Sequence, residues 1–316
     1  MPTHIAADGY VLGIVALVGL LVGSFLNVVI GRLPTMKERE WLGDCAAFVR
    51  ELAGRTPSRD ELGENRARLL SSGLPAEEEE AAQPRFDLVM PHSCCPHCGH
   101  RIRAYENIPV LSYLALRGRC SSCRERISVR YPVVEIMTAV MSVTVVWQLG
   151  VGVAGLAAVG FTWALLAASW IDADTQYLPD DITLPLLWAG LLLNLYETFV
   201  PLEDAVLGAT AGYLSLWLVY WGFKLLTGKE GMGYGDFKLL AALGAWMGPY
   251  SLIVIILLSS VVGAIAGIAM IVFKGRERGA AIPFGPYLAA AGWLALIWGD
   301  DLSNLYLRTT GIGPPY

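Results

Sequence analysis

Residues 10–30 read YVLGIVALVGLLVGSFLNVVI, a run without a charged side chain. The hydrocarbon core of a bilayer is about 30 Å thick, so a helix that crosses it needs about 20 mostly apolar residues. Stretches of comparable length and polarity recur along the rest of the chain. The sequence therefore predicts an all-α polytopic membrane protein with about eight transmembrane helices. The expected spans are 10–30, 133–150, 152–171, 182–200, 205–226, 237–249, 250–273 and 284–300.

Two of these spans have features that disfavour a plain transmembrane helix. Gly244, Gly248 and Pro249 interrupt the span 237–249 and shorten it, so seven helices are the alternative. The first span could instead be a secretory signal. However, its flank carries His4 and Asp8 in place of Lys or Arg, and no AxA-like cleavage site follows. We expect it to be retained as a helix.

The basic residues are distributed unevenly, and their positions predict the orientation of the chain. Of the 23 Lys and Arg residues, 16 lie between Arg32 and Arg130. Because Lys and Arg are enriched on the cytoplasmic side, this region is expected inside, with the amino terminus outside. The remaining basic residues except Arg308 then also fall inside. The formal charge of −5 consequently describes no single surface, and no nucleic-acid partner is expected.

Composition divides the chain into four expected regions. Residues 1–35 hold the first transmembrane helix, 36–90 a cytoplasmic insertion, 91–130 a cytoplasmic zinc-binding domain, and 131–316 a peptidase transmembrane bundle. The insertion is rich in Ala, Glu and Arg and is interpreted as solvated and partly flexible. Its recognisable parts are two stretches of helical composition, Glu38 to Leu52 and Arg59 to Leu70, and an acidic run, Glu77 to Glu80.

The region 91–130 holds two CxxC pairs. Cys95-Pro-His-Cys98 is followed by 21 residues and then by Cys120-Ser-Ser-Cys123. Two such pairs at this spacing are the typical ligand set of a tetrahedral zinc site. Disulfides are the alternative, but thiols stay reduced in the cytoplasm. Four thiolates leave no position for water, so the zinc would be structural.

Other residues near these pairs leave the ligand set open. A neighbouring cysteine or histidine could replace one of the four ligands, and the candidates are Cys94, His97 and His100. Cys45 lies outside the cluster, and we interpret it as a free thiol.

Acidic residues at the ends of apolar spans are functional candidates, because a carboxylate is costly inside hydrocarbon. Asp172 ends the third expected span, and Asp236 begins the sixth within Gly233-Tyr-Gly-Asp236. In the predicted topology both lie at the cytoplasmic boundary. Helix capping is the alternative role for each, and Asp174 is the second candidate for the first carboxylate.

Two carboxylates that share a proton can hydrolyse a peptide bond, one as base on a water and the other as acid. Gly233 and Gly235 would let a substrate backbone approach Asp236. We expect the other acidic and basic residues nearby to have structural roles. Asp180 and Asp181 would cap the fourth span, while Glu135 and Lys238 would belong to ion pairs.

Other hydrolytic chemistries lack their residues in this chain. All four histidines lie at or before His100, and neither an HExxH nor a GxSxG motif occurs. A zinc protease and a serine hydrolase are therefore disfavoured.

Several motifs, in one order along the chain, resemble the type IV prepilin peptidases. The resemblance covers the chain except residues 36–90. Besides the two CxxC pairs, it is carried by Gly23-Ser-Phe-Leu-Asn-Val-Val-Ile-Gly-Arg-Leu-Pro34, Ile108-Pro-Val-Leu-Ser112, Arg130-Tyr-Pro-Val-Val-Glu135, the stretch from Ile171-Asp172 to Leu178-Pro-Asp180, Gly233-Tyr-Gly-Asp236 and Ile282-Pro-Phe-Gly-Pro-Tyr287.

The resemblance implies an inner-membrane enzyme whose catalytic aspartates are Asp172 and Asp236. Its zinc ligands would be Cys95, Cys98, Cys120 and Cys123. It would cleave the basic leader of prepilins and pseudopilins after the terminal Gly, on the cytoplasmic side. It would then transfer a methyl group from S-adenosylmethionine to the new amino terminus. The substrate would be a transmembrane helix with its positive leader inside, and Glu77 to Glu80 could attract that leader.

Three other functions are weighed against this one. The first is a peptidase without methyltransferase activity. The second is an ion or proton carrier, which is disfavoured because few charged groups lie within the expected spans. The third is a non-catalytic assembly protein that docks through the zinc loop, and such a protein would tolerate the loss of Asp172 and Asp236.

Overall fold

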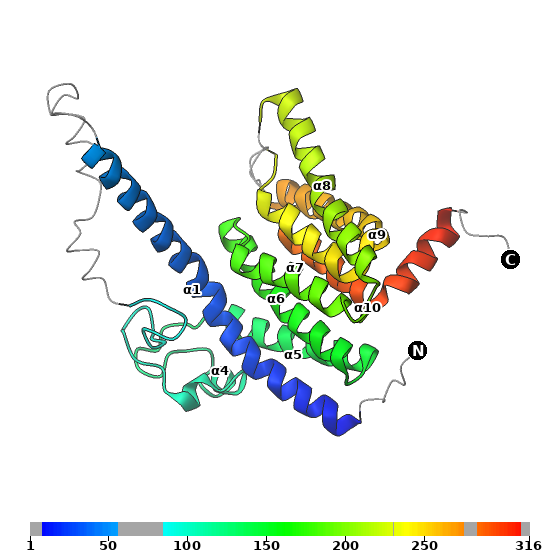
Figure 1. Ribbon diagram of the computed structural model, residues 1–316. Helices are drawn as coiled ribbons and strands as arrows, with labels where there is room; N and C mark the ends of the chain where they lie inside the picture. Colours follow the sequence, from blue (N-terminus) through cyan, green and yellow to red (C-terminus); the bar gives the residue numbers. More distant parts are fainter. Residues whose placement is uncertain (1–7, 56–84, 230, 275–282, 311–316) are drawn as a thin grey trace. The chain divides into compact units, whose positions relative to one another are not determined.

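The computed structural model describes residues 8–55, 85–229, 231–274 and 283–310 (Figure 1). The chain divides into two units, one formed by residues 1–30 and 103–316 and the other by residues 31–102. The described residues are helical or irregular, and their extended pairing is limited to two isolated bridges. The elements are α1 (Gly9–Arg55), η1 (Ala104–Asn107), α4 (Leu111–Ala115), α5 (Arg130–Leu149), α6 (Val153–Thr175), α7 (Asp180–Asn194), α8 (Leu202–Thr227), α9 (Tyr234–Lys274) and α10 (Gly285–Thr310).

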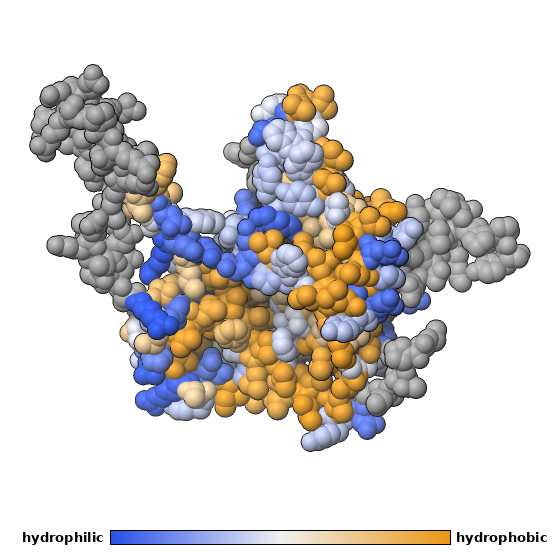
Figure 2. All heavy atoms as spheres, in the orientation of Figure 1, coloured by the Kyte–Doolittle hydropathy of each residue, from blue (hydrophilic) through white to orange (hydrophobic). Residues whose placement is uncertain are grey.

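Five of these helices are long and apolar enough to cross a membrane. The qualifying segments are Gly9–Phe48, Arg130–Leu149, Val153–Thr175, Leu202–Thr227 and Tyr234–Met270. Figure 2 shows hydrophobic side chains on the visible surface where the first half of α1 crosses α5 and α6, and hydrocarbon rather than water would cover them. The prediction of an all-α membrane protein is confirmed.

The eight expected spans correspond to seven long helices among the described residues, because α9 contains two of the spans. Gly248 breaks α9, with φ 75° and ψ 178°, directly before Pro249. The interruption expected from Gly248 and Pro249 is therefore present, and it separates the spans 237–249 and 250–273. Counted with the two halves of α9 apart, the helices agree with the expected number of about eight.

The end of α7 comes earlier than expected. The span predicted at 182–200 ends as a helix at Asn194, whose buried side chain has partners on both sides. Its Nδ2 donates to Ala245 O on α9 at 2.9 Å, and its Oδ1 accepts from Phe199 N at 3.0 Å and Val200 N at 3.2 Å. The side chain thus satisfies the turn after α7 and attaches it to α9.

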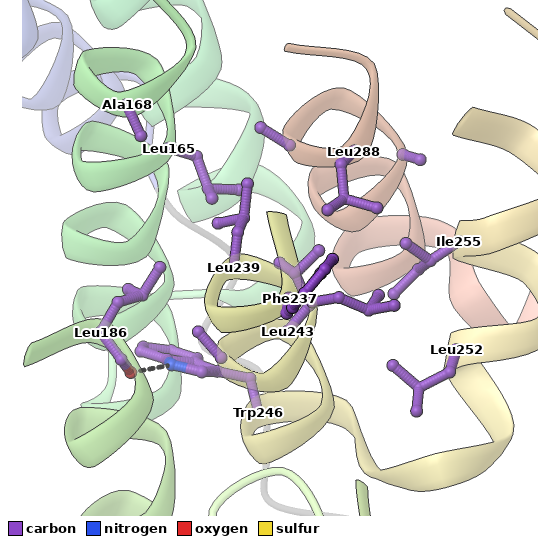
Figure 3. Close-up of a cluster of buried hydrophobic side chains, with 14 of the residues drawn as sticks. Leu165, Ala168, Leu186, Phe237, Leu239, Leu243, Trp246, Leu252, Ile255 and Leu288 are labelled. Atoms are coloured by element: carbon purple, nitrogen blue, oxygen red, sulfur yellow. Dashed lines mark hydrogen bonds between the residues drawn. The ribbon is translucent and has the colours of Figure 1, made fainter. Parts of the chain in front are cut away.

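The first half of α9 forms the core of the larger unit. Phe237, Leu239, Leu243 and Trp246 are almost fully buried, and Figure 3 shows them between side chains of α6, α7 and α10. The indole nitrogen of Trp246 donates to Leu186 O on α7 at 2.8 Å. This helix carries Asp236 in its first turn, so the most buried element also positions a candidate catalytic residue.

Two close helix contacts depend on glycine. A Cβ on Gly208 of α8 would lie 2.3 Å from Gly244 O of α9. A Cβ on Gly23 of α1 would lie 2.6 Å from the Cα of Glu135 on α5. Small residues at such points let the backbones of membrane helices approach closely.

The smaller unit contains the later part of α1 and the described residues 85–102. Arg32 donates to Asp87 O at 2.9 Å and to Pro91 O at 2.6 Å, and Arg39 lies over the ring of Phe86. Backbone N–H groups of residues 89 and 90 donate to the Asp87 carboxylate and lower its pKa. The helical stretch expected at 38–52 is part of α1, whereas Arg59 to Leu70 and Glu77 to Glu80 lie outside the described residues.

Candidate active site and metal-binding cysteines

Asp172 lies in the last turns of α6 and is 5% exposed. Its Oδ2 accepts a hydrogen bond from Gly285 N, the first residue of α10, at 3.0 Å. A helix amino terminus is a favourable place for a carboxylate, because its N–H groups are unsatisfied and the helix dipole is positive there. The start of α10 therefore fixes one oxygen of Asp172.

Asp236 is the third residue of α9 and is 7% exposed. Its Oδ1 is buried and has no hydrogen-bond partner among the described residues. The backbone next to Asp236 and the backbone that holds Asp172 both lie against Leu178, so the fold brings the two carboxylates into one region. Buried polar atoms are normally paired, and a catalytic role is one explanation for a buried atom without a protein partner.

Leu178 lies between the two segments that hold the carboxylates. A Cβ on Gly235 would lie 2.7 Å from the Cβ of Leu178, and a Cβ on Gly285 would lie 3.1 Å from its Cδ1. The absence of a side chain at Gly235 thus lets Leu178 pack against its backbone. We had expected it to let the substrate backbone approach Asp236. Gly233 has only Gly235 N near its Cβ position, at 4.0 Å. Sequence reasoning assigned no role to Leu178 or Gly285, because their contacts arise only in the folded chain.

The second candidate for the first carboxylate is engaged elsewhere. Asp174 Oδ2 lies 2.5 Å from Arg130 Nη1 in an ion pair, and its side chain is 41% exposed. Arg130 also stacks over the ring of Trp170. The geometry therefore favours Asp172 over Asp174 as the partner of Asp236.

An ion pair joins α7 to α9 close to Asp236. Lys238 Nζ lies 2.7 Å from both carboxylate oxygens of Asp180. The expected ion-pair role of Lys238 is confirmed. Asp180 and Asp181 are in the first turn of α7, but Pro179 is the N-cap residue and no side chain caps it. The expectation that these aspartates cap the helix is wrong, although their charges still favour the positive end of the helix dipole.

Glu135 has hydrogen-bond donors as its described partners, not a cation. Its Oε2 accepts from Val110 N at 2.7 Å, and it also interacts with the Ser24 side chain. The expectation of an ion pair for Glu135 is therefore wrong, because its described partners are neutral hydrogen-bond donors. Three of the motifs quoted above meet here, since Ser24, Val110 and Glu135 come from three of them.

The two CxxC pairs form turns with the same hydrogen bonds. Cys95 N donates to His100 O at 2.9 Å, and its carbonyl accepts from Gly99 N. Cys120 N donates to Glu125 O at 2.8 Å, and its carbonyl accepts from Arg124 N. In each turn the residue after the second cysteine has a positive φ, which is 70° at Gly99 and 64° at Arg124.

The sulfur atoms of Cys95, Cys98, Cys120 and Cys123 all lie within 4.8 Å of one another, so this cluster could hold a metal ion. A tetrahedral zinc with bonds of about 2.3 Å places its sulfurs roughly 3.8 Å apart, which fits this spacing. None of the six cysteines forms a disulfide. Cys45 is exposed and free, as expected, and Cys94, His97 and His100 are not part of the cluster.

Two family models match the chain. The bacterial peptidase A24 N-terminal domain matches residues 17–149, and the type IV leader peptidase family matches residues 159–268. The first match contains all four clustered cysteines, and the second contains both Asp172 and Asp236.

Curated relatives match over nearly the whole chain. A prepilin leader peptidase/N-methyltransferase of Pseudomonas putida is 53% identical over 300 residues, which are 94% of this chain and 95% of the relative. A protein of the same name from Aeromonas hydrophila is 52% identical, and the match covers 93% of this chain and 93% of that protein. One from Neisseria gonorrhoeae is 48% identical, and the match covers 91% of this chain and 90% of that protein. No solved structure matches the chain. Because the sequence identity is this high over nearly the full length of this chain and of its relatives, the chain belongs to the type IV leader peptidase family.

Proposed function

We propose that this protein cleaves the leader peptide of type IV prepilins and type II secretion pseudopilins and then methylates the new amino terminus. Family membership supports the activity, since relatives about 53% identical are named prepilin leader peptidase/N-methyltransferase. One structural observation carries the assignment of the site. Two buried carboxylates, Asp172 and Asp236, come from the ends of different helices and lie near each other, and one oxygen of Asp236 has no partner among the described residues.

The proposed cleavage uses the two aspartates as a proton-transfer pair. One carboxylate removes a proton from a water, whose oxygen attacks the carbonyl carbon of the scissile bond. The other carboxyl group donates a proton to the leaving amine as the carbon–nitrogen bond breaks. The N–H of Gly285 holds Asp172 in place, and the burial of both groups strengthens their mutual interaction.

The methyl group would come from S-adenosylmethionine, whose sulfonium makes its methyl carbon electrophilic toward the amine that cleavage releases. We assign no residues to this donor. A peptidase without methyltransferase activity is the alternative, and the mass of the mature amino terminus distinguishes the two.

The four clustered cysteines would hold zinc through their thiolates. Four protein ligands leave no coordination position for a water, so the metal would stabilise the region 91–130 and take no part in hydrolysis. We therefore separate the metal site from the catalytic pair.

The proposed location is the inner membrane, with the active site and the cysteine cluster on the cytoplasmic side. The concentration of basic residues between Arg32 and Arg130 supports this orientation. The candidate residues also lie at one end of their helices, because α6 ends and α7, α9 and α10 begin next to them.

The test is the processing of a prepilin by membranes that carry Asp172→Asn or Asp236→Asn. Each substitution is expected to reduce leader removal at least 1,000-fold, because neither amide can accept or supply the transferred proton. Asp174→Asn is the matched comparison and should keep the rate within about threefold. Full processing by either dyad variant would refute the assignment of that carboxylate and make Asp174 or Asp180 the next candidate.

A further inference from the structure

A large apolar cavity lies between α1, α6 and α7, with a volume of about 1100 Å³. It extends along α6 from Val153 to Ala167 and along α7 from Asp181 to Leu193. The 14 helical rises from Val153 to Ala167 on α6 span roughly 21 Å. The cavity is therefore an elongated groove along two neighbouring helices, and it exceeds the usual 300–1,000 Å³ of a small-molecule site.

The groove presents hydrocarbon and very few polar atoms. Trp163 and Trp246 line it, but their indole nitrogens donate elsewhere, to Ser142 Oγ at 2.9 Å and Leu186 O at 2.8 Å. No lining residue has an atom among the buried unsatisfied polar atoms of the described chain. A ligand recognised through hydrogen bonds would find few partners here, whereas an apolar segment would bury its surface.

One wall of the groove is made of small residues. On α6 they are Ala157, Gly160, Ala164 and Ala167, spaced by three, four and three residues on one helix face. A Cβ on Gly160 would meet nothing within 4 Å. Such a face lets a second helix approach closely in a membrane, and a flexible acyl chain does not require it.

The single charged residue of the groove lies at the end nearest the catalytic pair. Asp181 follows Asp180, which is paired with Lys238, two residues beyond Asp236. At the other end Tyr196 is 86% exposed, and Leu192 on the wall is 57% exposed, so the groove is open to the bilayer from the side.

We propose that this groove binds the transmembrane helix of the substrate and thereby places the leader junction at Asp172 and Asp236. The inference rests on the proposed function, because that function requires a substrate with a basic leader followed by an apolar helix. The apolar helix fits the groove, and the negative charge of Asp181 complements the basic segment that precedes the helix. Docking of the helix would convert cleavage into an intramolecular step at a fixed depth.

The first test compares Gly160→Leu, which fills the groove, with Gly222→Leu on α8. Both glycines are helical with open space at the Cβ position, and Gly222 is not in the groove. With full-length prepilin in detergent micelles, Gly160→Leu should raise the half-saturating substrate concentration at least fivefold and keep the maximal rate within twofold. Gly222→Leu should change neither. A lower maximal rate without a change in half-saturation, or equal effects of both variants, would overturn the proposal.

The second test does not depend on tolerance of the glycine substitution. A photoreactive benzoyl-phenylalanine at Leu192 should crosslink to the substrate helix, and the same residue at Leu218 on α8 should not. Both leucines are exposed, at 57% and 61%. Leu192 lies 11 residues beyond Asp181, about 16 Å along α7, so the crosslink should fall about 11 residues after the cleavage site. Crosslinks to lipid alone would assign the groove to acyl chains.

The proposed function and the assignment of the groove can be refuted separately. If the unmodified protein leaves every prepilin uncleaved, the proposed function is wrong. If it cleaves prepilin while Gly160→Leu keeps normal half-saturation and Leu192 gives no substrate crosslink, only the groove assignment is wrong.

Discussion

Gly285 holds the candidate catalytic carboxylate of Asp172 from the start of another helix. Its N–H donates to Asp172 Oδ2, and its α-carbon lies so close that an added Cβ would be 2.7 Å from the same oxygen. The residue thus combines a hydrogen-bond donor with the absence of a side chain. Any larger residue would have to displace the carboxylate or the start of α10.

We therefore predict that Gly285→Ala lowers the rate of leader removal at least tenfold, which corresponds to about 1.4 kcal/mol of activation free energy. The measurement is the initial rate of cleavage in membranes that contain matched amounts of protein. Gly299→Ala is the control, because this glycine lies in the same helix with nothing within 4 Å of its Cβ position. An unchanged rate for Gly285→Ala would mean that the Asp172 contact is not needed.

At the residue scale the candidate site residues could be selected from the sequence, whereas the residues that contact them could not. Asp172, Asp236 and the four cysteines could be selected because charge in apolar sequence and CxxC spacing are local signals. Gly285 and Leu178 could not be selected for a role. Their contacts join segments that are far apart in the chain, and neither side chain carries a chemical group that marks it.

At the scale of elements, the packing of α8 on α9 depends on a pair of glycines. The Cβ positions of Gly208 and Gly244 would each lie within 2.3 Å of backbone atoms of the other helix. Because those atoms belong to the backbone, a side chain at either position cannot be accommodated by a change of rotamer. The two helices would have to separate along their contact.

Gly208→Leu is expected to destabilise the protein by about 3 kcal/mol, the upper part of the range for overpacked interiors. For a chain of this size that lowers the thermal midpoint in detergent by roughly 6 to 12 °C. Gly222→Leu on the same helix should leave the midpoint within about 2 °C, because its Cβ position is open. Equal midpoints for the two variants would contradict the close approach of α8 and α9.

The helix boundaries show where sequence patterns stop being informative. The break at Gly248 was predictable, since a glycine directly before a proline disfavours a continuous helix. The early end of α7 was not predictable. Apolar composition continues past Asn194, and the turn there is stabilised by the contact of this side chain with Ala245 on α9.

At the scale of the whole molecule, the cysteine cluster and the two candidate catalytic aspartates lie in different parts of the sequence. The cluster belongs to the match at residues 17–149 and the aspartates to the match at residues 159–268. The sequence was enough to predict the order of these two parts, the membrane class and the family. Long apolar runs and ordered motifs can be recognised without knowledge of the folded structure. The contacts that join the helices could not.

We predict that Cys95→Ser, which removes one of the four cysteine ligands, abolishes the stable binding of one zinc per chain. The same substitution should make the segment around residues 94–101 sensitive to protease. The loss follows because a structural site derives its stability from all four ligands. Zinc content after purification and limited proteolysis in membranes are the measurements. Cys45→Ser is the control and should retain full zinc content, since this exposed cysteine is not in the cluster. Equal zinc content in the two variants would refute the assignment.

The break at Gly248 also determines where hydrolysis can take place. From Tyr234 to Met247 the first half of α9 is about 21 Å long, which is shorter than the roughly 30 Å of a hydrocarbon core. Gly248, at its far end, lies near the side chain of Asp204 in the first turn of α8, where polar groups favour the opposite head-group layer. A helix that starts from that layer leaves Tyr234 about 9 Å short of the other one, and Asp236 about 12 Å short. We therefore expect the bilayer to thin there or to admit water, which would bring water to a peptide bond beside Asp236.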